Sequence, residues 1–274
     1  MNVLVLDVGG THVKMLATGQ TEERKFVSGP TLTPQQMVSR VERTVGDWKY
    51  DAVSIGYPGP VLRDRPVAEP HNLAAGWVGF DFEGAFHCPV KLVNDAAMQA
   101  LGSYKGGKML FLGLGTGLGS ALVVDGIVEP MELGHLPYKR RTYEDYVGLR
   151  GLQKLGKNKW RRHVADVVAR LIAALEPDDV VLGGGNVKDL KALPPGCRAG
   201  DNANAFIGGF RLWENAADRR RSRPAKARSK RKPASSKKTN LGIRKDHADG
   251  HSRRNTREGP AGRTSGMEGP GDPL

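Results

Sequence analysis

Glycine-rich turns of the kind that can grip a phosphate group occur at three places in the chain, each directly after a short apolar run. The first run ends at Asp7, which is followed by Gly9, Gly10 and Thr11, with Lys14 shortly after. Small residues let backbone N–H groups approach an anion, and a carboxylate beside such a turn can hold Mg²⁺ through water. For this segment alone, a purely structural hairpin is the alternative interpretation.

The second turn, Leu112–Gly119, lies between two predicted strands. It is not the phosphate loop that precedes a helix, because no lysine follows and no helix clearly starts there. It also differs from the dinucleotide-binding fingerprint, since a strand resumes at Ser120. The third turn is Gly183–Asn186. Together, the two turns supply these candidate phosphate contacts: Gly115, Thr116, Gly117, Gly184 and Gly185. Three ordinary hairpins are the alternative, but the shared strand-then-glycine context favours a phosphate held from two sides.

Asp95 is the candidate catalytic residue. It follows Asn94 at the end of the predicted strand Val90–Val93 and precedes a helical run. A carboxylate in this place can accept a proton from a substrate hydroxyl. It can equally serve as a helix N-cap, which is the usual role of Asp at a helix start.

Glu132 and His135 form a second polar pair, three residues apart. A sugar presents several hydroxyls in fixed directions, and a carboxylate with an imidazole can satisfy more than one of them. A lone Glu or His is more often structural, and the same holds for the polar and aromatic cluster Pro70–Leu73 with Trp77.

Hydrophobic periodicity predicts an α/β protein, because strands and helices alternate along the chain. Strands are expected at 3–7, 12–17, 51–56, 90–93, 108–114, 120–124 and 180–182, and helices at 34–48, 96–104, 164–175 and 204–213.

The net charge of +13 is concentrated in the last part of the chain. Residues 219–274 hold 17 Lys and Arg against five Asp and Glu, a net charge of +12, which leaves +1 for the rest. This segment is poor in large apolar residues, so we expect a disordered basic tail. Nonspecific binding of nucleic acid or another polyanion by this tail is weighed against a merely solvated appendage, and no specific nucleic-acid partner is expected.

Cysteine content and hydropathy indicate the compartment. Two distant cysteines, Cys88 and Cys197, suit a reducing cytoplasm and exclude both a disulfide framework and a four-cysteine metal site. The start of the sequence lacks the features of a signal peptide, and no run approaches the roughly 20 apolar residues of a membrane span. We therefore expect a cytoplasmic protein without a membrane partner.

Taken in order, these motifs resemble those of the ROK family of sugar kinases. The resemblance covers about residues 1–215 and rests on segments 7–11, 94–97, 112–119, 132–135 and 183–185. It implies the actin-like ATPase (ribonuclease-H-like) fold, with a cleft between an N-terminal α/β domain at 1–105 and a C-terminal one at 106–203. A final helix at about 204–215 is expected to pack back on the first domain. It also implies a homodimer.

The resemblance further implies transfer of a phosphoryl group to the 6-hydroxyl of glucose, giving glucose 6-phosphate, with Asp95 as the base. The glucose contacts would be Asn94, Asp95, Glu132, His135 and, less directly, Glu144. The donor would be held by Asp7, Gly9, Gly10, Thr11, Lys14, Gly115, Thr116, Gly117, Gly184 and Gly185, with Mg²⁺ near Asp7 through water.

One departure from the family concerns zinc. ROK kinases commonly follow the Glu-x-Gly-His segment with a cysteine cluster that binds zinc, whereas residues 137–148 contain no cysteine. We therefore expect no zinc, with His135 serving only as a sugar contact. The same stretch, together with residues 157–162, 183–188 and 204–213, resembles the polyphosphate glucokinase branch, which accepts inorganic polyphosphate as well as ATP.

A charge argument supports polyphosphate use independently. Residues 139–162 hold nine Lys and Arg against two acidic residues. A polymeric phosphate needs a line of cations beyond the transfer site, whereas ATP needs few. A solvated basic helix face is the alternative reading.

The rival functions are a strictly ATP-dependent ROK hexokinase and a sugar-sensing ROK regulator. The regulators carry a helix-turn-helix before the first phosphate motif, which here begins within the first ten residues.

Overall fold

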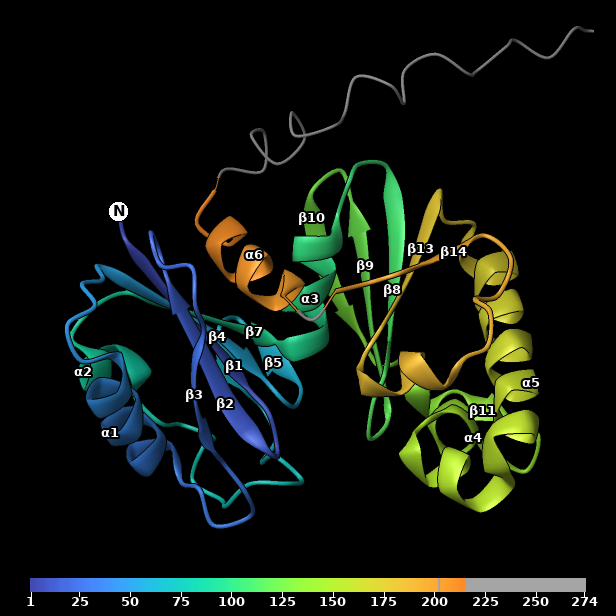
Figure 1. Cartoon of the computed structure of the whole chain (residues 1–274), viewed down its shortest axis with the longest axis horizontal. Coiled ribbons are helices and arrows are strands. Elements are labelled where there is room, and N and C mark those ends of the chain that lie inside the picture. The colour runs from blue at the N-terminus through green and yellow to red at the C-terminus, as the bar shows by residue number, and fades with distance from the viewer. Residues whose placement is uncertain (202, 215–274) are drawn as a thin grey trace, which may run out of the picture. The chain divides into compact units, whose positions relative to one another are not determined.

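The computed structural model of the chain describes residues 1–201 and 203–214, and it has the predicted mixture of helices and strands (Figure 1). The predicted tail at 219–274 lies outside the described residues. None of the helices in the described part is both long and apolar enough to span a bilayer.

The first sheet has the strand order β3-β2-β1-β4-β7. Its strands are β1 (Val3–Val8), β2 (His12–Ala17), β3 (Arg24–Val27), β4 (Ala52–Tyr57) and β7 (Val90–Asn94). β1, β2 and β3 pair antiparallel, whereas β4 and β7 run parallel to β1. Alternate residues of β1 face opposite sides of the sheet. Leu4 and Leu6 belong to the hydrophobic core under α1 (Pro34–Val45) and α2 (Phe82–Phe86). Val3 and Val5 belong to a second core, with α3 (Asp95–Ser103) and α6 (Asn204–Arg211).

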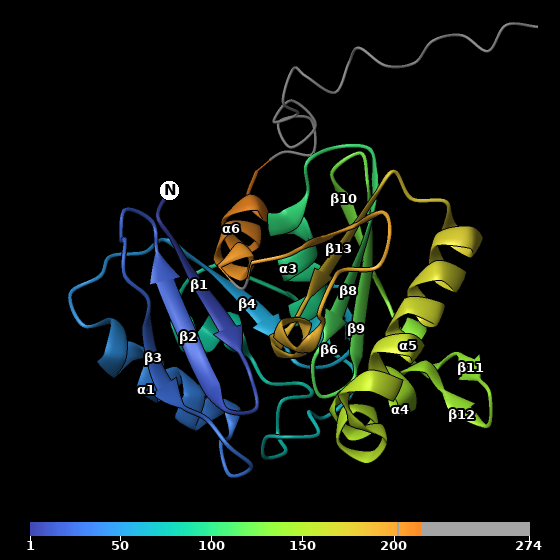
Figure 2. The same cartoon turned by 45° about the vertical axis from the view of Figure 1, so that its right-hand side comes forward.

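The second sheet has the order β10-β9-β8-β13-β14. Its strands are β8 (Lys108–Leu114), β9 (Leu118–Val124), β10 (Ile127–Met131), β13 (Asp179–Gly183) and β14 (Cys197–Ala199). Three antiparallel strands are again followed by two that run parallel to the first of them. One face packs on α5 (Leu149–Leu175), and the other on α3, whose Ala97 and Ala100 share a core with Phe111. α3 thus packs against both sheets, as Figures 1 and 2 show.

The remaining elements are short. They are β5 (Val61–Leu62), β6 (Arg65–Pro66), the 3₁₀ turn η1 (Leu133–His135), β11 (Pro137–Tyr138), β12 (Arg141–Thr142), α4 (Tyr143–Val147) and the 3₁₀ turn η2 (Gly185–Asp189). Every predicted strand and helix has a counterpart, but the helix expected from Val164 begins at Leu149 instead. Its first half is rich in Lys and Arg and is interrupted at Gly156, which has a φ of 72°, so its periodicity is weak.

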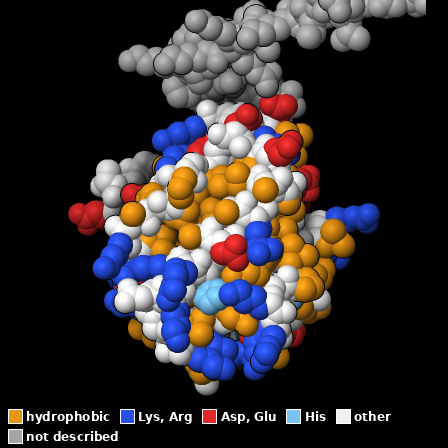
Figure 3. Space-filling model, turned by 90° about the vertical axis from the view of Figure 1, so that its right-hand side faces the viewer, with side chains coloured by type: hydrophobic (Ala, Val, Ile, Leu, Met, Phe, Trp, Pro, Cys, Tyr) orange, Lys and Arg blue, Asp and Glu red, His pale blue; other side chains and the backbone are white. Residues whose placement is uncertain are grey.

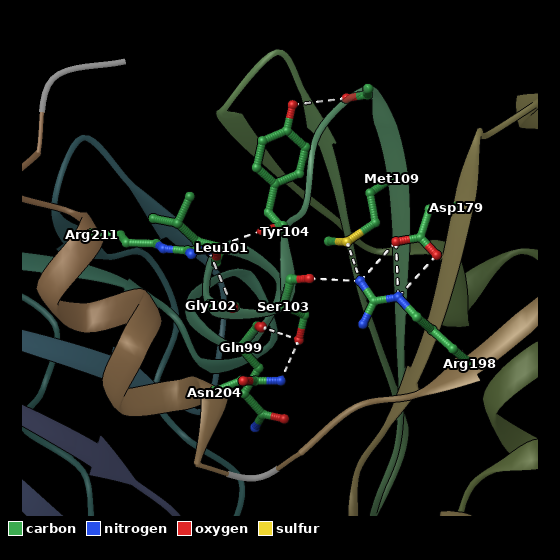
Figure 4. A network of polar contacts seen from close by, with 11 residues as sticks. Gln99, Leu101, Gly102, Ser103, Tyr104, Met109, Asp179, Arg198, Asn204 and Arg211 are labelled. Carbon is green, nitrogen blue, oxygen red and sulfur yellow. Dashed lines mark hydrogen bonds and ion pairs between the residues drawn. The ribbon is translucent and has the colours of Figure 1, made fainter. Parts of the chain in front are cut away.

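Two arginines fix the carboxyl end of α3 (Figure 4). Arg211 of α6 donates to the backbone oxygens of Leu101, Gly102 and Tyr104 at 2.9, 3.3 and 3.0 Å. Arg198 of β14 donates to the oxygen of Ser103 at 2.6 Å while it pairs with Asp179 of β13. Because the last carbonyls of a helix lack partners within the helix, these contacts satisfy them and tie α3 to α6 and to the second sheet.

Candidate active site

The first glycine turn joins β1 to β2 and is fastened from outside by Ser28. The Ser28 hydroxyl donates to the oxygen of Gly9 at 2.6 Å, and its backbone N–H donates to the oxygen of Thr11 at 3.0 Å. Gly10 leaves no room for a side chain, since a Cβ there would lie 2.8 Å from the Cβ of Asn72. The turn is therefore held rigidly. Nothing in the local sequence marked Ser28, and Asn72 carried only a weak signal.

Asp7 lies one residue before the end of β1, where it pairs across the hairpin with Lys14 and across the parallel pair with Gly56. Burial raises the pKa of the Asp7 carboxyl, and the neighbouring Lys14 ammonium partly offsets the rise. A partly buried carboxylate with a cation beside it, at the edge of a glycine turn, suits phosphate chemistry.

Asp95 is the first residue of α3, but it is not the cap of that helix. The side-chain oxygen of Asn94 accepts from the backbone N–H groups of Ala96 and Ala97 at 2.9 and 3.2 Å, so Asn94 is the N-cap. The Asn94 amide nitrogen donates to the oxygen of Gly59 at 3.0 Å. Asn94 therefore fills the capping role that was the alternative for Asp95. One Asp95 oxygen still accepts a hydrogen bond from the Ala96 N–H.

The electrostatic surroundings of Asp95 suit a general base. Burial, and next the negative charge of Asp7, raise its pKa to about 7, with a smaller contribution from Glu132. Gly56 lies between Asp7 and Asp95: it pairs with Asp7 in the sheet, and a Cβ on Gly56 would lie 3.6 Å from the Asp95 Cα. A pKa near 7 is the value at which a carboxyl can both accept and release a proton at neutral pH.

The same two carboxylates fit a magnesium ion. Among the described residues no group of three or more His, Cys, Asp or Glu side chains could hold a metal. Mg²⁺, however, keeps several waters and binds through one or two carboxylates plus substrate phosphates. Asp7 is therefore the ligand on the protein side that the site offers, and the charge of Mg²⁺ would relieve the repulsion between Asp7 and Asp95.

The second and third glycine turns are neighbours. β8 and β13 pair in parallel up to Gly113 and Gly183, so both chains turn at the same edge of the sheet. The Asn186 amide donates to the oxygen of Gly115 at 2.8 Å, and a Cβ on Gly184, whose φ is 85°, would lie 2.5 Å from the Leu114 oxygen. Residues 115–117 and 184–186 thus form one backbone-lined corner.

The described link between this corner and Asp95 is a close packing of β9 on α3. A Cβ on Gly119 would lie only 2.9 Å from the Cβ of Ala96, the residue after Asp95. The second turn therefore ends directly against the start of the helix that carries the candidate base. The predicted cleft between two domains stays a prediction.

Glu132 immediately precedes η1 and His135 ends it, just beyond β10. The buried Ser120 hydroxyl donates to the oxygen of Met131 at 2.6 Å and accepts from the N–H of Leu133 at 3.1 Å, which fixes the backbone on both sides of Glu132. The Glu132 carboxylate and the His135 imidazole are 3.6 Å apart, with 60% and 69% of their side chains exposed. Both groups are thus held in place and free to contact a ligand.

Glu144 of α4 lies against the second turn. Its carboxylate oxygen would be 2.5 Å from a Cβ on Gly117, and its own Cβ is 3.5 Å from the corresponding position on Gly134. The structure therefore brings Glu144 beside Gly117 and next to the segment that carries Glu132 and His135. This geometry is consistent with the less direct assignment of Glu144, which sequence spacing could not test.

Lys and Arg side chains gather on the face that carries α4 and the first half of α5 (Figure 3). Arg150 pairs with Asp145, Lys157 pairs with Asp189, and Arg161 donates to the Asp189 backbone oxygen. Six further exposed cations form no salt bridge with any carboxylate that the structure describes: Lys139, Arg140, Arg141, Lys154, Lys159 and Arg162. α5 starts at the second turn, because the N–H of Leu149 donates to the oxygens of Gly115 and Thr116.

Comparisons with known proteins point to one family. The model of the ROK family matches residues 3–146. A polyphosphate glucokinase of Mycobacterium leprae is 26% identical over 202 residues, which cover 66% of this chain and 62% of that protein, so somewhat less than two thirds of its length is matched.

Solved structures show the fold. An inorganic polyphosphate/ATP-glucomannokinase of Arthrobacter sp. strain KM superposes with a TM-score of 0.65 at 20% identity over 80% of this chain and 98% of that one. A ROK family glucokinase of Streptomyces griseus, solved with glucose and AMPPNP, superposes with a TM-score of 0.63 at 16% identity over 77% of this chain and 99% of that one. The predicted actin-like ATPase fold of two α/β domains is confirmed.

Proposed function

The chain belongs to the ROK family, and from that premise we propose that it is a glucokinase that transfers a phosphoryl group to the 6-hydroxyl of glucose. The single observation that carries the proposal is the position of Asp95: beside Asp7, behind the end of the second glycine turn, with a pKa of about 7. The polyphosphate glucokinase of M. leprae and the glucokinase of S. griseus support glucose as the acceptor.

Asp95 accepts the proton of the 6-hydroxyl as that oxygen attacks the terminal phosphorus in line. Glu132, His135 and Glu144 hold the other hydroxyls of the sugar. Asn94 fixes the start of α3 and contacts the sugar with the second hydrogen of its amide nitrogen. Phosphoryl transfer depends mainly on such positioning and on stabilising charge over the equatorial oxygens.

The donor phosphates are held by the backbone N–H groups of the first turn and of the corner at 115–117 and 184–186. Lys14 adds a positive charge beside Asp7. Mg²⁺ held by Asp7 through water would neutralise the developing charge on the phosphoryl oxygens.

Inorganic polyphosphate is the proposed donor, alongside ATP. The six cations of the basic face that form no described salt bridge lie on the β11–β12 hairpin and on α5, which begins at the second turn. A long polyanion that leaves the transfer site along this helix would meet them in succession, whereas ATP would not need them. The similarity to enzymes named for polyphosphate use points the same way.

A coupled assay for glucose 6-phosphate, run with ATP and with long-chain polyphosphate at equal glucose, tests the proposal. We expect turnover with both donors. Turnover with ATP alone would make the protein a strictly ATP-dependent hexokinase. Glucose binding without turnover on either donor would contradict the kinase assignment and favour a sugar-sensing role.

We further propose that the enzyme acts in the cytoplasm as a homodimer, as the family resemblance implies, and without zinc. Sedimentation velocity at enzyme concentrations used in the assay tests the dimer. Retained activity after dialysis against a zinc-selective chelator, with Mg²⁺ restored, tests independence from zinc.

A further inference from the structure

A short hairpin joins the two halves of the proposed sugar site. His135 ends η1, the strands β11 and β12 follow, and Glu144 comes just after, in α4. The hairpin closes through the pairs Pro137–Thr142 and Tyr138–Arg141, and the N–H of Tyr143 donates to the oxygen of Leu136 at 3.0 Å. Whatever fixes this hairpin therefore fixes the separation between His135 and Glu144.

Tyr138 fastens the hairpin to α5 through its hydroxyl group. The hydroxyl donates to the Asp166 carboxylate at 2.7 Å and lies 3.0 Å from the Nδ1 atom of His163. The ring is buried and packs against Tyr143 and Tyr146, with centroid distances of 5.4 and 5.1 Å. Asp166 also receives a hydrogen bond from Arg170 at 3.2 Å.

The protonation states follow from these contacts. Burial, and then the hydrogen bond to Asp166, raise the pKa of Tyr138, so its hydroxyl keeps its proton. That hydrogen bond is also the first cause of the lowered pKa of Asp166, which remains a carboxylate. Because the one hydroxyl hydrogen goes to Asp166, the Nδ1 atom of His163 must carry a hydrogen and donate it to the Tyr138 oxygen.

The charged groups around His163 hold it neutral. Burial lowers the pKa of the imidazole, as does the nearby Lys139 ammonium, against the opposing effect of Asp166; Arg162 adds to the lowering. At neutral pH the Tyr138 hydroxyl thus donates to Asp166 and accepts from His163.

From these contacts we infer that Tyr138 is a positioning residue for glucose. Its hydroxyl, held by Asp166 and His163 of α5, sets the hairpin and so places His135 and Glu144 on the same sugar. This inference rests on the proposed function. Tyr138, Asp166 and His163 would thus hold the sugar-contacting residues in place from outside the sugar site.

The Tyr138→Phe variant tests the inference, because it keeps the ring and removes only the hydroxyl. We expect the KM for glucose to rise roughly tenfold while kcat changes by less than about twofold, the pattern of lost substrate binding rather than lost chemistry. The KM for ATP should not change. Tyr146→Phe is the matched control: its ring contacts Tyr138 and His163 at 5.1 and 4.8 Å, and it should leave all three constants near the wild-type values.

Glucose affinity by titration calorimetry provides a readout independent of turnover and should weaken in parallel with the KM. An unchanged KM and affinity in a folded Tyr138→Phe protein would overturn the inference, as would an equal effect of Tyr146→Phe. If Tyr138→Phe does not fold, Asp166→Asn decides by the same criteria, since it removes the charged acceptor and preserves the shape. A wild-type protein that binds glucose but does not phosphorylate it would contradict the proposed function. The comparison of glucose affinities between the wild type and the two variants would still test the role of Tyr138.

Discussion

The two sheets repeat one topology, and their first hairpins can be compared position by position. The last pair before the turn is Val8–Val13 in the first sheet and Leu114–Leu118 in the second. One step earlier, Asp7 faces Lys14 in the first, and in the second the equivalent residues are both glycine, Gly113 and Gly119. The strand beside each hairpin contributes a glycine in both cases, Gly56 or Gly183.

Packing explains why the second hairpin has lost its charged pair. Gly119 abuts Ala96 of α3, so no side chain fits where the first hairpin has Lys14. A Cβ on Gly183 would likewise lie 2.5 Å from the Phe111 ring. The second turn can therefore offer a ligand backbone groups and the Thr116 hydroxyl, while the first adds a carboxylate and an ammonium. The difference between the hairpins supports the proposal that metal and proton chemistry belong to the first sheet and phosphate binding to the second.

The largest effect should come from Asp95→Asn, which removes the proposed base at the start of α3, between the two hairpins. We expect turnover to fall about 10³-fold, the usual contribution of a general base, and glucose affinity to change only a few-fold. Steady-state kinetics and calorimetry measure the two quantities. Near-normal turnover would contradict the role of Asp95, and the unchanged cap at Asn94 keeps the helix start intact as an internal control.

The Gly119→Ala variant tests whether the second hairpin is bare for steric reasons. The added methyl group would meet Ala96 at 2.9 Å and push the start of α3, so turnover should fall roughly 10²-fold through displacement of Asp95. Gly113→Ala, on the facing strand, is the matched control, because the nearest atom there is 3.4 Å away, an ordinary contact. Equal losses in the two variants would show that the packing of α3 is not the cause.

Much of this comparison was predictable from sequence, since an apolar run followed by glycines is a local signal. The strands that frame each turn, the glycine corners and the helix after Asn94 all follow from residues close together in the chain. The competing roles of Asp95 could not be separated in this way. Asn94 and Asp95 are both good N-caps, and only the hydrogen bonds to Ala96 and Ala97 decide which residue caps.

The features that sequence reasoning missed depend on contacts between distant segments. Ser28, directly after β3, fastens the first turn, and Ser120 fixes Glu132 across a strand pair. Both are single hydroxyls in segments without a motif. The start of α5 was missed for another reason: Gly156 and a dense run of cations hide the helical period until the Trp160 contact with the sheet is known.

The pH profile gives a smaller and more specific test of the two carboxylates. Only ionised Asp95 accepts a proton, and its pKa is about 7, so kcat/KM should rise about tenfold per pH unit up to that value and then level off. Asp7 raises this pKa by its negative charge. In Asp7→Asn, the rising limb of kcat/KM for the donor, which reports the enzyme before donor and Mg²⁺ bind, should move to lower pH even though the rate itself drops. A limb that stays in place, or moves to higher pH, would show that the charge of Asp7 does not raise the pKa of Asp95.

The smallest effect concerns the basic face, which lies over α4 and the first half of α5, on the second sheet. Lys159 is exposed on α5 and unpaired among the described residues, so Lys159→Glu should raise the KM for long-chain polyphosphate about fivefold, the scale of one exposed charge interaction. The KM for ATP should be unchanged, and the polyphosphate effect should shrink with added salt. Lys49→Glu, an exposed cation of the first domain, is the control for net charge. Equal responses of the two variants would mean that overall charge attracts the polymer, and the basic segment of α5 would then be an ordinary solvated helix face.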